Sequence, residues 1–267
     1  MDFIWLFYPL LGCLVGFLAG LLGIGGGLLS VPILLMIFKL QGIEHPDLYK
    51  IALATSTAAI SFTAFSSMRS HWKHSNVNWS VVKRLLPGIA LGTLIGAQLV
   101  HHLPTTPLRI IFVGFTFYTA YKMLLPRLPR ASRTLPSAPV MALVGAIIGL
   151  ISTLISAGGG FISVPFMIRS NVSARLAIGT SAALGFPIAL GAVFGYIVTG
   201  HATAGLPNFT FAYIYLPAVL GIVLTSALCA PIGAAMAQRW DVSTLKKIFA
   251  ALLLFLGTQM LYQLIFN

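Results

Sequence analysis

The sequence is short of charged residues, and most of all of acidic ones. Only 7% of the 267 residues are charged and 58% are hydrophobic, whereas a soluble domain carries about 25% charged residues. This composition excludes a soluble globular domain and predicts an integral protein of the lipid bilayer. The net charge of +12 therefore predicts basic cytoplasmic loops rather than a nucleic-acid partner.

The few acidic residues all lie in expected loops or near the N-terminus: Asp2, Glu44, Asp47 and Asp241. Carriers of metal cations or protons usually place a carboxylate inside the membrane, so the sequence favours an anionic or neutral substrate. The two cysteines are isolated in apolar segments, and no Cys/His cluster or Ser/His/Asp grouping occurs. We therefore expect no metal, no cofactor, no catalytic residues and hence no enzyme.

Long unbroken apolar runs predict helices that cross the membrane, because the strands of a barrel would alternate over about ten residues. The expected fold class is an all-α integral membrane protein of about 10 helical segments, since a crossing needs about 20 residues. The segments cover residues 3–22, 28–40, 51–68, 85–103, 108–125, 140–156, 161–168, 176–198, 211–237 and 245–266.

A glycine-rich motif occurs twice in the chain. Residues 25–32 read Gly-Gly-Gly-Leu-Leu-Ser-Val-Pro and residues 158–165 read Gly-Gly-Gly-Phe-Ile-Ser-Val-Pro, at an offset of 133. Later matches, such as Gly96 with Gly233, follow at an offset of 137. The sequence thus predicts a duplication, with a first transmembrane repeat at 1–125, a cytoplasmic linker at 126–139 and a second repeat at 140–267.

The basic residues predict the orientation in the membrane. If loop 69–84 is cytoplasmic, every Lys and Arg except Lys39, Lys50 and Arg109 falls on the cytoplasmic side, as the positive-inside rule requires. The two halves then run in opposite directions, and inverted-topology repeats are a hallmark of secondary transporters. We expect a multi-pass protein of the cytoplasmic (inner) membrane with both termini outside.

The same orientation makes each glycine motif the tip of a helical hairpin. Segment 161–168 would rise only about 12 Å, less than half of the roughly 30 Å hydrocarbon core. We expect two re-entrant or broken hairpins that enter from opposite faces and bring their glycine-rich tips together inside the protein. Irregular backbone is tolerated at that depth only where protein or water satisfies it.

Each tip would present unpaired backbone N–H groups at the start of a short helix, and such a helix N-terminus favours anions. Glycine lets the backbone approach a ligand closely, and a serine one turn later adds a hydroxyl donor. The candidate substrate-binding residues are Gly25, Gly26, Gly27, Ser30, Gly158, Gly159, Gly160 and Ser163, with Thr55, Ser56, Thr180 and Ser181 as second-rank candidates. The alternatives are close helix packing at the glycines and ordinary hydrogen bonds between helices at the hydroxyls.

The doubled Gly-Gly-Gly-x-x-x-Val-Pro motif, in a chain of this length, resembles the TauE/SafE family of sulfite and organosulfonate exporters. The resemblance covers essentially the whole chain and implies a permease of the cytoplasmic membrane for sulfite, sulfoacetate or related anions. The second motif is preceded by Ser156 and Ala157 where the first has Gly23 and Ile24. Its approach helix is therefore expected to bend differently.

The residues and the resemblance together predict a secondary transporter, and more specifically an exporter, that moves a small sulfite- or sulfonate-like anion by alternating access. A permease for a different small carboxylate or for a neutral sulfur compound is an alternative. A non-transporting membrane scaffold is the alternative from another class. The substrate, the direction of flux, ion coupling and oligomeric state stay open, and a homodimer is one option.

Overall fold

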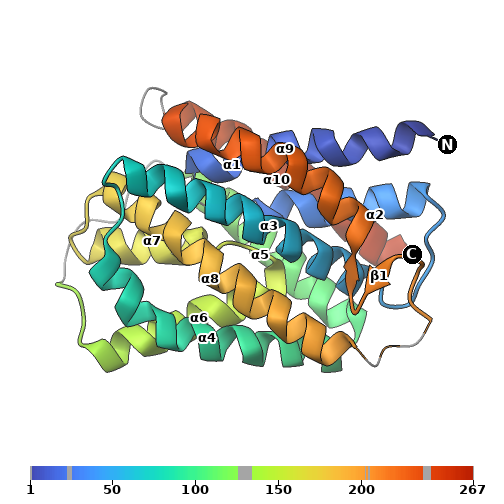
Figure 1. The fold of residues 1–267 in the computed structure, drawn as a ribbon, viewed down its shortest axis with the longest axis horizontal. Helices are drawn as coiled ribbons and strands as arrows, with labels where there is room; N and C mark the ends of the chain where they lie inside the picture. Colours follow the sequence, from blue (N-terminus) through green and yellow to red (C-terminus); the bar gives the residue numbers. More distant parts are fainter. Residues whose placement is uncertain are drawn as a thin grey trace.

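The computed structural model describes residues 2–22, 26–125, 134–201, 203, 205–236 and 242–266. Within these ranges the chain forms ten α-helices, a short 3-10 helix and one pair of strands, so the predicted all-α class is confirmed. The elements, shown in Figure 1, are η1 (Asp2–Leu6), α1 (Phe7–Leu22), α2 (Gly27–Leu40), α3 (Leu48–Lys73), α4 (Trp79–His102), α5 (Thr105–Leu124), α6 (Ala138–Ile155), α7 (Gly160–Arg169), α8 (Ala174–Gly200), β1 (Thr210–Phe211), β2 (Ile214–Tyr215), α9 (Leu216–Met236) and α10 (Val242–Phe266).

Seven helices of the described residues are long and apolar enough to cross a membrane, which confirms a multi-pass membrane protein. They are α1 with the end of η1, α3, α4, α6, α8, α9 and α10. Helices α2 and α7 are apolar but short, with 14 and 10 residues. At 1.5 Å per residue α7 rises about 15 Å, roughly half of the hydrocarbon core.

Helices α3 and α4 extend further into the basic loop than hydropathy predicted. Only residues 74–78 separate them, where a loop from 69 to 84 was expected. The side chain of Asn78 accepts a hydrogen bond from the Val81 N–H at 3.3 Å and so caps α4. Hydropathy marks where lipid contact ends, whereas capping and backbone hydrogen bonds decide where a helix ends.

A short hairpin replaces the expected start of the helix at residue 211. Thr210 pairs with Tyr215 and Phe211 with Ile214, and α9 begins only after this hairpin. Ala212 between the two strands has a φ of 52°, a left-handed conformation that a right-handed helix does not accept. Because this stretch is apolar, its composition predicted a helix and gave no signal for a turn.

Two tightly packed helix pairs join the early and late parts of the chain, α1 with α9 and α4 with α6. A Cβ added at Gly16 of α1 would lie 2.3 Å from the carbonyl oxygen of Ser226 on α9. A Cβ added at Gly92 of α4 would lie 2.0 Å from the carbonyl oxygen of Ala146 on α6. Helices approach this closely in membranes only where small residues face the partner.

Helices α3 and α8 cross the middle of the molecule and pack against each other (Figure 1). Helix α3 also packs on α9, and α8 packs on α4. If α1 to α5 are matched in order with α6 to α10, the contacts occur in equivalent pairs. The α1–α9 contact then corresponds to α6–α4, and α3–α9 corresponds to α8–α4.

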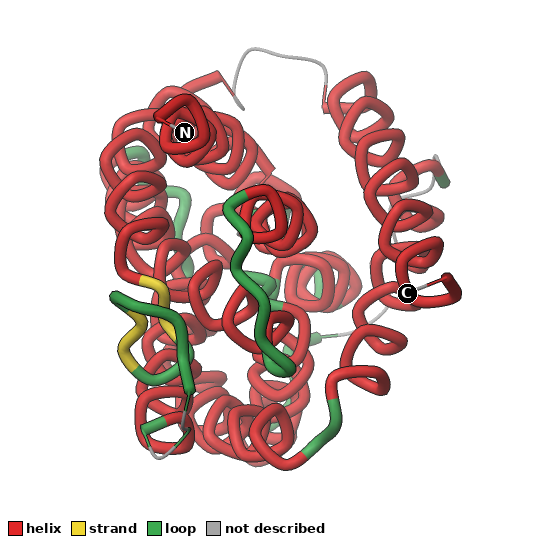
Figure 2. The backbone as a smooth tube through the Cα atoms, turned by 90° about the vertical axis from the view of Figure 1, so that its right-hand side faces the viewer, coloured by secondary structure: helices red, strands yellow, loops and turns green. Residues whose placement is uncertain are grey.

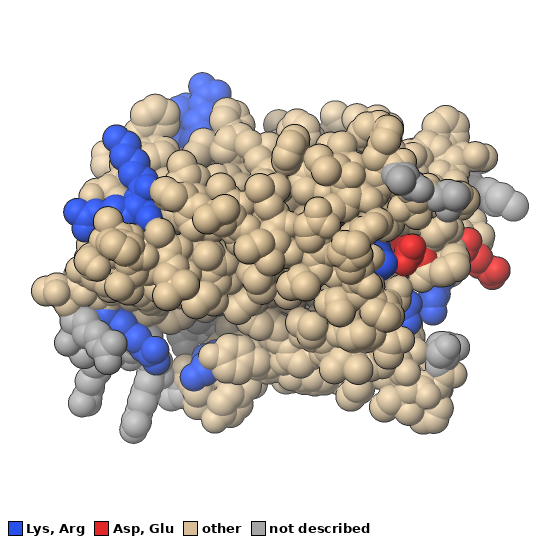
Figure 3. Space-filling model, turned by 90° about the horizontal axis from the view of Figure 1, so that it is seen from below, with Lys and Arg blue, Asp and Glu red and all other residues tan. Residues whose placement is uncertain are grey.

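The two ends of the molecule differ in charge. The end of α3 and the start of α4 carry Arg69, Lys73, Lys83 and Arg84, whereas Asp47 lies just before α3 at the other end. On the face seen in Figure 3, most Lys and Arg side chains gather at one end, and the acidic side chains lie at the opposite end. Both termini and the β1–β2 hairpin lie toward the acidic end (Figures 1 and 2).

Candidate substrate site

Helices α2 and α7 begin with the same backbone cap. Gly26 before α2 has φ 71° and ψ −5°, and Gly159 before α7 has φ 76° and ψ −8°. Glycine is the residue that adopts this left-handed conformation without steric cost. The Gly26 carbonyl accepts from the N–H groups of the third and fourth residues after it, at 3.1 and 3.2 Å, and the Gly159 carbonyl does the same at 3.1 and 2.9 Å.

The two glycine-rich segments touch each other inside the protein. A Cβ added at Gly27, the first residue of α2, would lie 1.4 Å from the carbonyl oxygen of Ser156, which ends α6. Gly26, Gly27, Ser156 and the segment 157–160 are all buried. Figure 1 shows α2 and α7 in opposite halves of the molecule, so their starts approach from opposite ends.

The start of α7 has backbone donors that no protein group uses. Among the described residues, no hydrogen bond is formed by the N–H groups of Gly158, Gly159, Gly160 and Phe161. Such groups at a helix start have no acceptor within the helix itself. Gly25 of the first segment lies outside the described residues.

The serine one turn into each short helix bonds to the neighbouring long helix. Ser30 of α2 shares a hydrogen bond with Ser56 of α3. Ser163 of α7 donates to Ser181 of α8 at 3.0 Å. All four predicted serines therefore lie in two equivalent buried pairs.

Ser156 adds a link that the sequence did not predict. Its hydroxyl donates to Ser56 Oγ at 2.9 Å and lies 2.8 Å from Thr57 Oγ1. It thus ties the end of α6 to α3. The available signal was the mismatch within the motif, because the first copy has Gly23 at this position.

Thr55 and Thr180 lie in equivalent positions but bond away from the glycine-rich segments. Thr55 Oγ1 accepts a hydrogen bond at 2.9 Å from the N–H of Tyr215, the residue before α9. Thr180 Oγ1 accepts at 2.9 Å from the N–H of Asn78, the residue before α4. Thr55 thus joins α3 to the start of α9, and Thr180 joins α8 to the start of α4.

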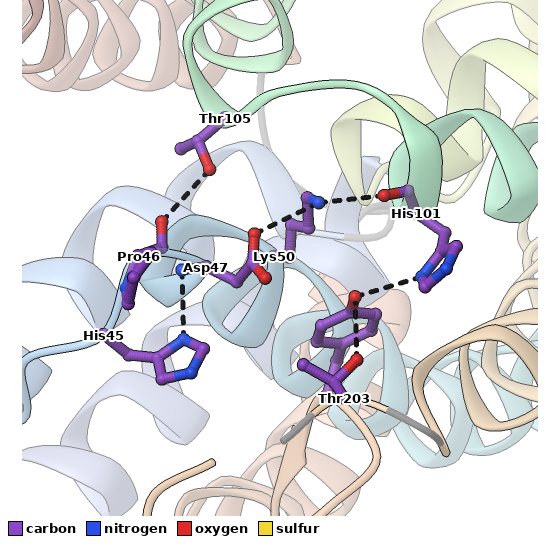
Figure 4. Close-up of polar contacts among 8 residues, drawn as sticks. His45, Pro46, Asp47, Lys50, His101, Thr105 and Thr203 are labelled. Carbon is purple, nitrogen blue, oxygen red and sulfur yellow. Dashed lines mark hydrogen bonds and ion pairs between the residues drawn. The ribbon is translucent and has the colours of Figure 1, made fainter. Parts of the chain in front are cut away.

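A second polar cluster lies at the acidic end of the molecule (Figure 4). Lys50 pairs with Asp47 at 3.1 Å and donates to the His101 carbonyl at 2.9 Å. His101 Nδ1 lies 3.1 Å from the hydroxyl of Tyr213, which also accepts from Thr203 at 3.1 Å. The cluster connects the start of α3, the end of α4 and the segment before β1. Within the described residues, neither this cluster nor any other brings together three His, Cys, Asp or Glu side chains that could hold a metal ion.

These features define a class of protein. A multi-pass helical membrane protein in which two short helices begin in the interior, with their glycine-rich segments in contact, has the architecture of a small-molecule carrier.

The chain belongs to the family described as "Sulfite exporter TauE/SafE", whose model matches residues 8–260. It is 37% identical over 252 residues to a "Probable membrane transporter protein" of Haemophilus influenzae, covering 94% of this chain and 96% of that protein. It is 26% identical over 261 residues to "Probable membrane transporter protein MJ0441" of Methanocaldococcus jannaschii, covering 96% of each. It is 27% identical over 194 residues to "Probable membrane transporter protein YdhB" of Bacillus subtilis, covering 70% of this chain and 76% of that one. No solved structure matches the chain.

The family is one of membrane transporters. The predicted family and the prediction of a membrane transporter rather than an enzyme are therefore confirmed.

Proposed function

We propose that this protein is a secondary transporter that exports a small oxyanion, such as sulfite or an organosulfonate, by alternating access. One observation carries the proposal: two short helices begin in the interior with the same glycine cap, and no described residue accepts from the first backbone N–H groups of α7. A helix start carries about half a positive charge, and its N–H groups fit the oxygens of an anion.

The distribution of carboxylates supports an anionic substrate. Among the described residues no acidic residue falls within an α-helix, because Asp2 lies in η1 and Glu44 and Asp47 lie between α2 and α3. The fourth acidic residue, Asp241, lies outside the described residues. A buried carboxylate would repel an anion and attract a cation or a proton. The candidate site is instead lined by N–H donors and hydroxyls.

The arrangement in the membrane is part of the proposal. The equivalent helix contacts support two inverted repeats, 1–125 and 140–267, joined by the linker 126–139. The charge difference between the ends supports a cytoplasmic basic end, with both termini outside the inner membrane. Of the proposed linker the structure describes residues 134–139, and the last two of these already belong to α6, which begins at Ala138.

The candidate residues take different roles in this proposal. The glycines supply backbone donors and close approach: Gly25, Gly26, Gly27, Gly158, Gly159 and Gly160. Ser30 and Ser163 provide hydroxyls that Ser56 and Ser181 orient. The bonds of Thr55 and Thr180 to backbone N–H groups favour a structural role for these two residues.

Transport in proteoliposomes tests the proposal. Vesicles loaded with unlabelled sulfite are expected to accumulate labelled sulfite by counterflow, with and without a pH gradient to detect proton coupling. A thermal-shift screen of the purified protein against sulfite, methanesulfonate, acetate and dimethyl sulfone assigns the substrate class. Stabilisation by acetate or dimethyl sulfone alone would replace the oxyanion with a carboxylate or a neutral sulfur compound. A scaffold would respond to none of them.

A further inference from the structure

Ser152 of α6 carries a hydroxyl with no protein partner. The residue is 2% exposed, and its Oγ forms no hydrogen bond among the described residues. Leaving a hydroxyl unpaired in a low-dielectric interior is costly. An acceptor atom of a ligand at this position would satisfy the hydroxyl.

The hydroxyl also forms no bond to its own helix among the described residues. Other buried hydroxyls here bond back to the carbonyl four residues earlier, as Thr153 does to Gly149 and Thr116 to Phe112, both at 2.8 Å. Ser152 makes no such bond, although this conformation is open to serine in a helix. Its own carbonyl accepts from the Ala157 N–H at 2.9 Å and closes the end of α6.

The Ser152 hydroxyl faces the start of α7. A Cβ built on Gly159 would lie 3.4 Å from Ser152 Oγ, and the side chains of Ile148 and Ile188 lie on the same side of Gly159. Gly159 is the second of the four residues, 158–161, whose N–H groups form no hydrogen bond among the described residues. The Ser152 hydroxyl, unpaired among the described residues, thus lies beside Gly159, within the buried segment whose N–H groups are also unpaired.

We infer that Ser152 is a binding residue for the transported anion, and that the anion is held mainly at the start of α7. The inference rests on the proposed function. It adds Ser152 to the candidate site and names the start of α7 as the place where the anion is mainly held. A ligand that satisfies several N–H groups must offer several acceptor oxygens, and the partial positive charge at the helix start favours an anionic ligand. The side chains of Ile148 and Ile188 exclude water beside the anion, so the N–H groups and the Ser152 hydroxyl stabilise its charge.

The first half of the chain lacks this hydroxyl. At the offset of 133 that relates the glycine motifs, Ser152 corresponds to Ala19, a buried alanine of α1. The second half therefore has a donor that the first half lacks. The anion site is asymmetric even though the glycine caps are alike.

Binding of labelled sulfite to the purified full chain in detergent tests the inference, with Ser152→Ala as the variant and Ser67→Ala as the matched control. Ser67 of α3 is also 2% exposed with an unpaired hydroxyl. It lies 11 residues beyond Ser56 along α3, which is about 16 Å. Ser152→Ala is expected to weaken sulfite binding about tenfold, the loss of one hydrogen bond to a charged group. Ser67→Ala is expected to bind sulfite as the wild type does.

Thermal unfolding without ligand separates binding from a structural role. Removing an unpaired hydroxyl breaks no protein hydrogen bond, so the ligand-free Ser152→Ala protein is expected to unfold no earlier than the wild type. A lower midpoint assigns Ser152 a structural role and overturns the inference. Equal sulfite affinity in Ser152→Ala and wild type overturns the inference alone. A wild-type protein that binds neither sulfite nor methanesulfonate overturns the proposed function and the inference with it.

Discussion

The starts of α2 and α7 share one backbone geometry but differ in their surrounding hydroxyls. Their caps, Gly26 and Gly159, agree within 5° in φ and 3° in ψ. Beside α2, the hydroxyl of Ser30 meets Ser56, which also bonds Ser156. Beside α7, the hydroxyl of Ser152 has no partner in the part of the chain that the structure describes.

The difference separates what the backbone and the side chains would each contribute to the proposed anion site. The backbone cap sets the direction of the N–H groups at each helix start. The side chains set how many hydroxyls are free to bond a ligand, because hydroxyls bonded to one another are less available. Variants that change one helix start at a time distinguish the two contributions.

The largest effect is expected from valine at the glycine caps. In Gly26→Val and Gly159→Val the β-branched side chain must adopt a left-handed conformation, at a cost of about 1–2 kcal/mol. Its Cβ would also lie 2.5 Å from Val15 Cγ1 or 2.6 Å from Ile188 Cδ1. Each variant is expected to lower sulfite counterflow by about 100-fold or more, since a site displaced by about 1 Å loses function on this scale.

The matched control for the caps is Gly42→Val. Gly42 has φ 70°, yet nothing lies within 4 Å of its Cβ position. It therefore carries the same backbone strain in open space, and its flux is expected to stay near the wild-type value. Normal flux in both cap variants would contradict the candidate site.

A smaller effect, on stability, is expected from Gly27→Ala. The new methyl group would lie 1.4 Å from the Ser156 carbonyl oxygen, so the two glycine-rich segments must separate. Overpacking of this kind costs about 1–3 kcal/mol. A thermal midpoint lower than the wild type by several degrees checks it. Gly114→Ala on α5, where nothing lies within 4 Å of the Cβ position, serves as the control and should not lower the midpoint.

Ser156→Ala isolates the hydroxyl link between α6 and α3. Loss of the contacts with Ser56 and Thr57 is expected to destabilise the protein by about 1–2 kcal/mol. Ser156→Gly should lose less, because Ser156 has φ 53° and glycine adopts this conformation freely. Thermal unfolding ranks the three proteins. An alanine variant as stable as the wild type would show that the link contributes nothing to stability.

The smallest effect is expected at the ends of α3 and α8, where Lys50 corresponds to Arg175. Lys50 is buried and bonds Asp47 and the His101 carbonyl, whereas Arg175 is exposed. Asp47 is partly exposed, so solvent screening limits the loss in Lys50→Met to about 1 kcal/mol. Arg175→Met is expected within about 0.5 kcal/mol of the wild type. Equal unfolding midpoints for the two variants would contradict the comparison.

Composition predicted the all-α membrane fold class, and the doubled motif predicted where two short helices begin. The fold class follows from apolar length, and the motif marked Gly26 and Gly159 because a glycine triplet before a short apolar run has few other uses in a membrane protein. The link from Ser156 to Ser56 joins residues 100 positions apart, and local pattern carries no information about such contacts. Ser152 could not be predicted for the same reason, because the sequence pattern around a serine in an apolar helix does not depend on whether its hydroxyl is bonded or free.

The reciprocal bonds of Thr55 and Thr180 have a consequence for the order in which the chain assembles during synthesis. The N–H of Asn78 finds its acceptor only when Thr180, 102 residues later, has left the ribosome and entered the membrane. The bond to Thr55 forms later still, because its donor, the N–H of Tyr215, is synthesised 160 residues after Thr55. The first half therefore cannot reach its final packing until a large part of the second half has been synthesised. A chain cut in the linker would need both pieces in one membrane at the same time to fold.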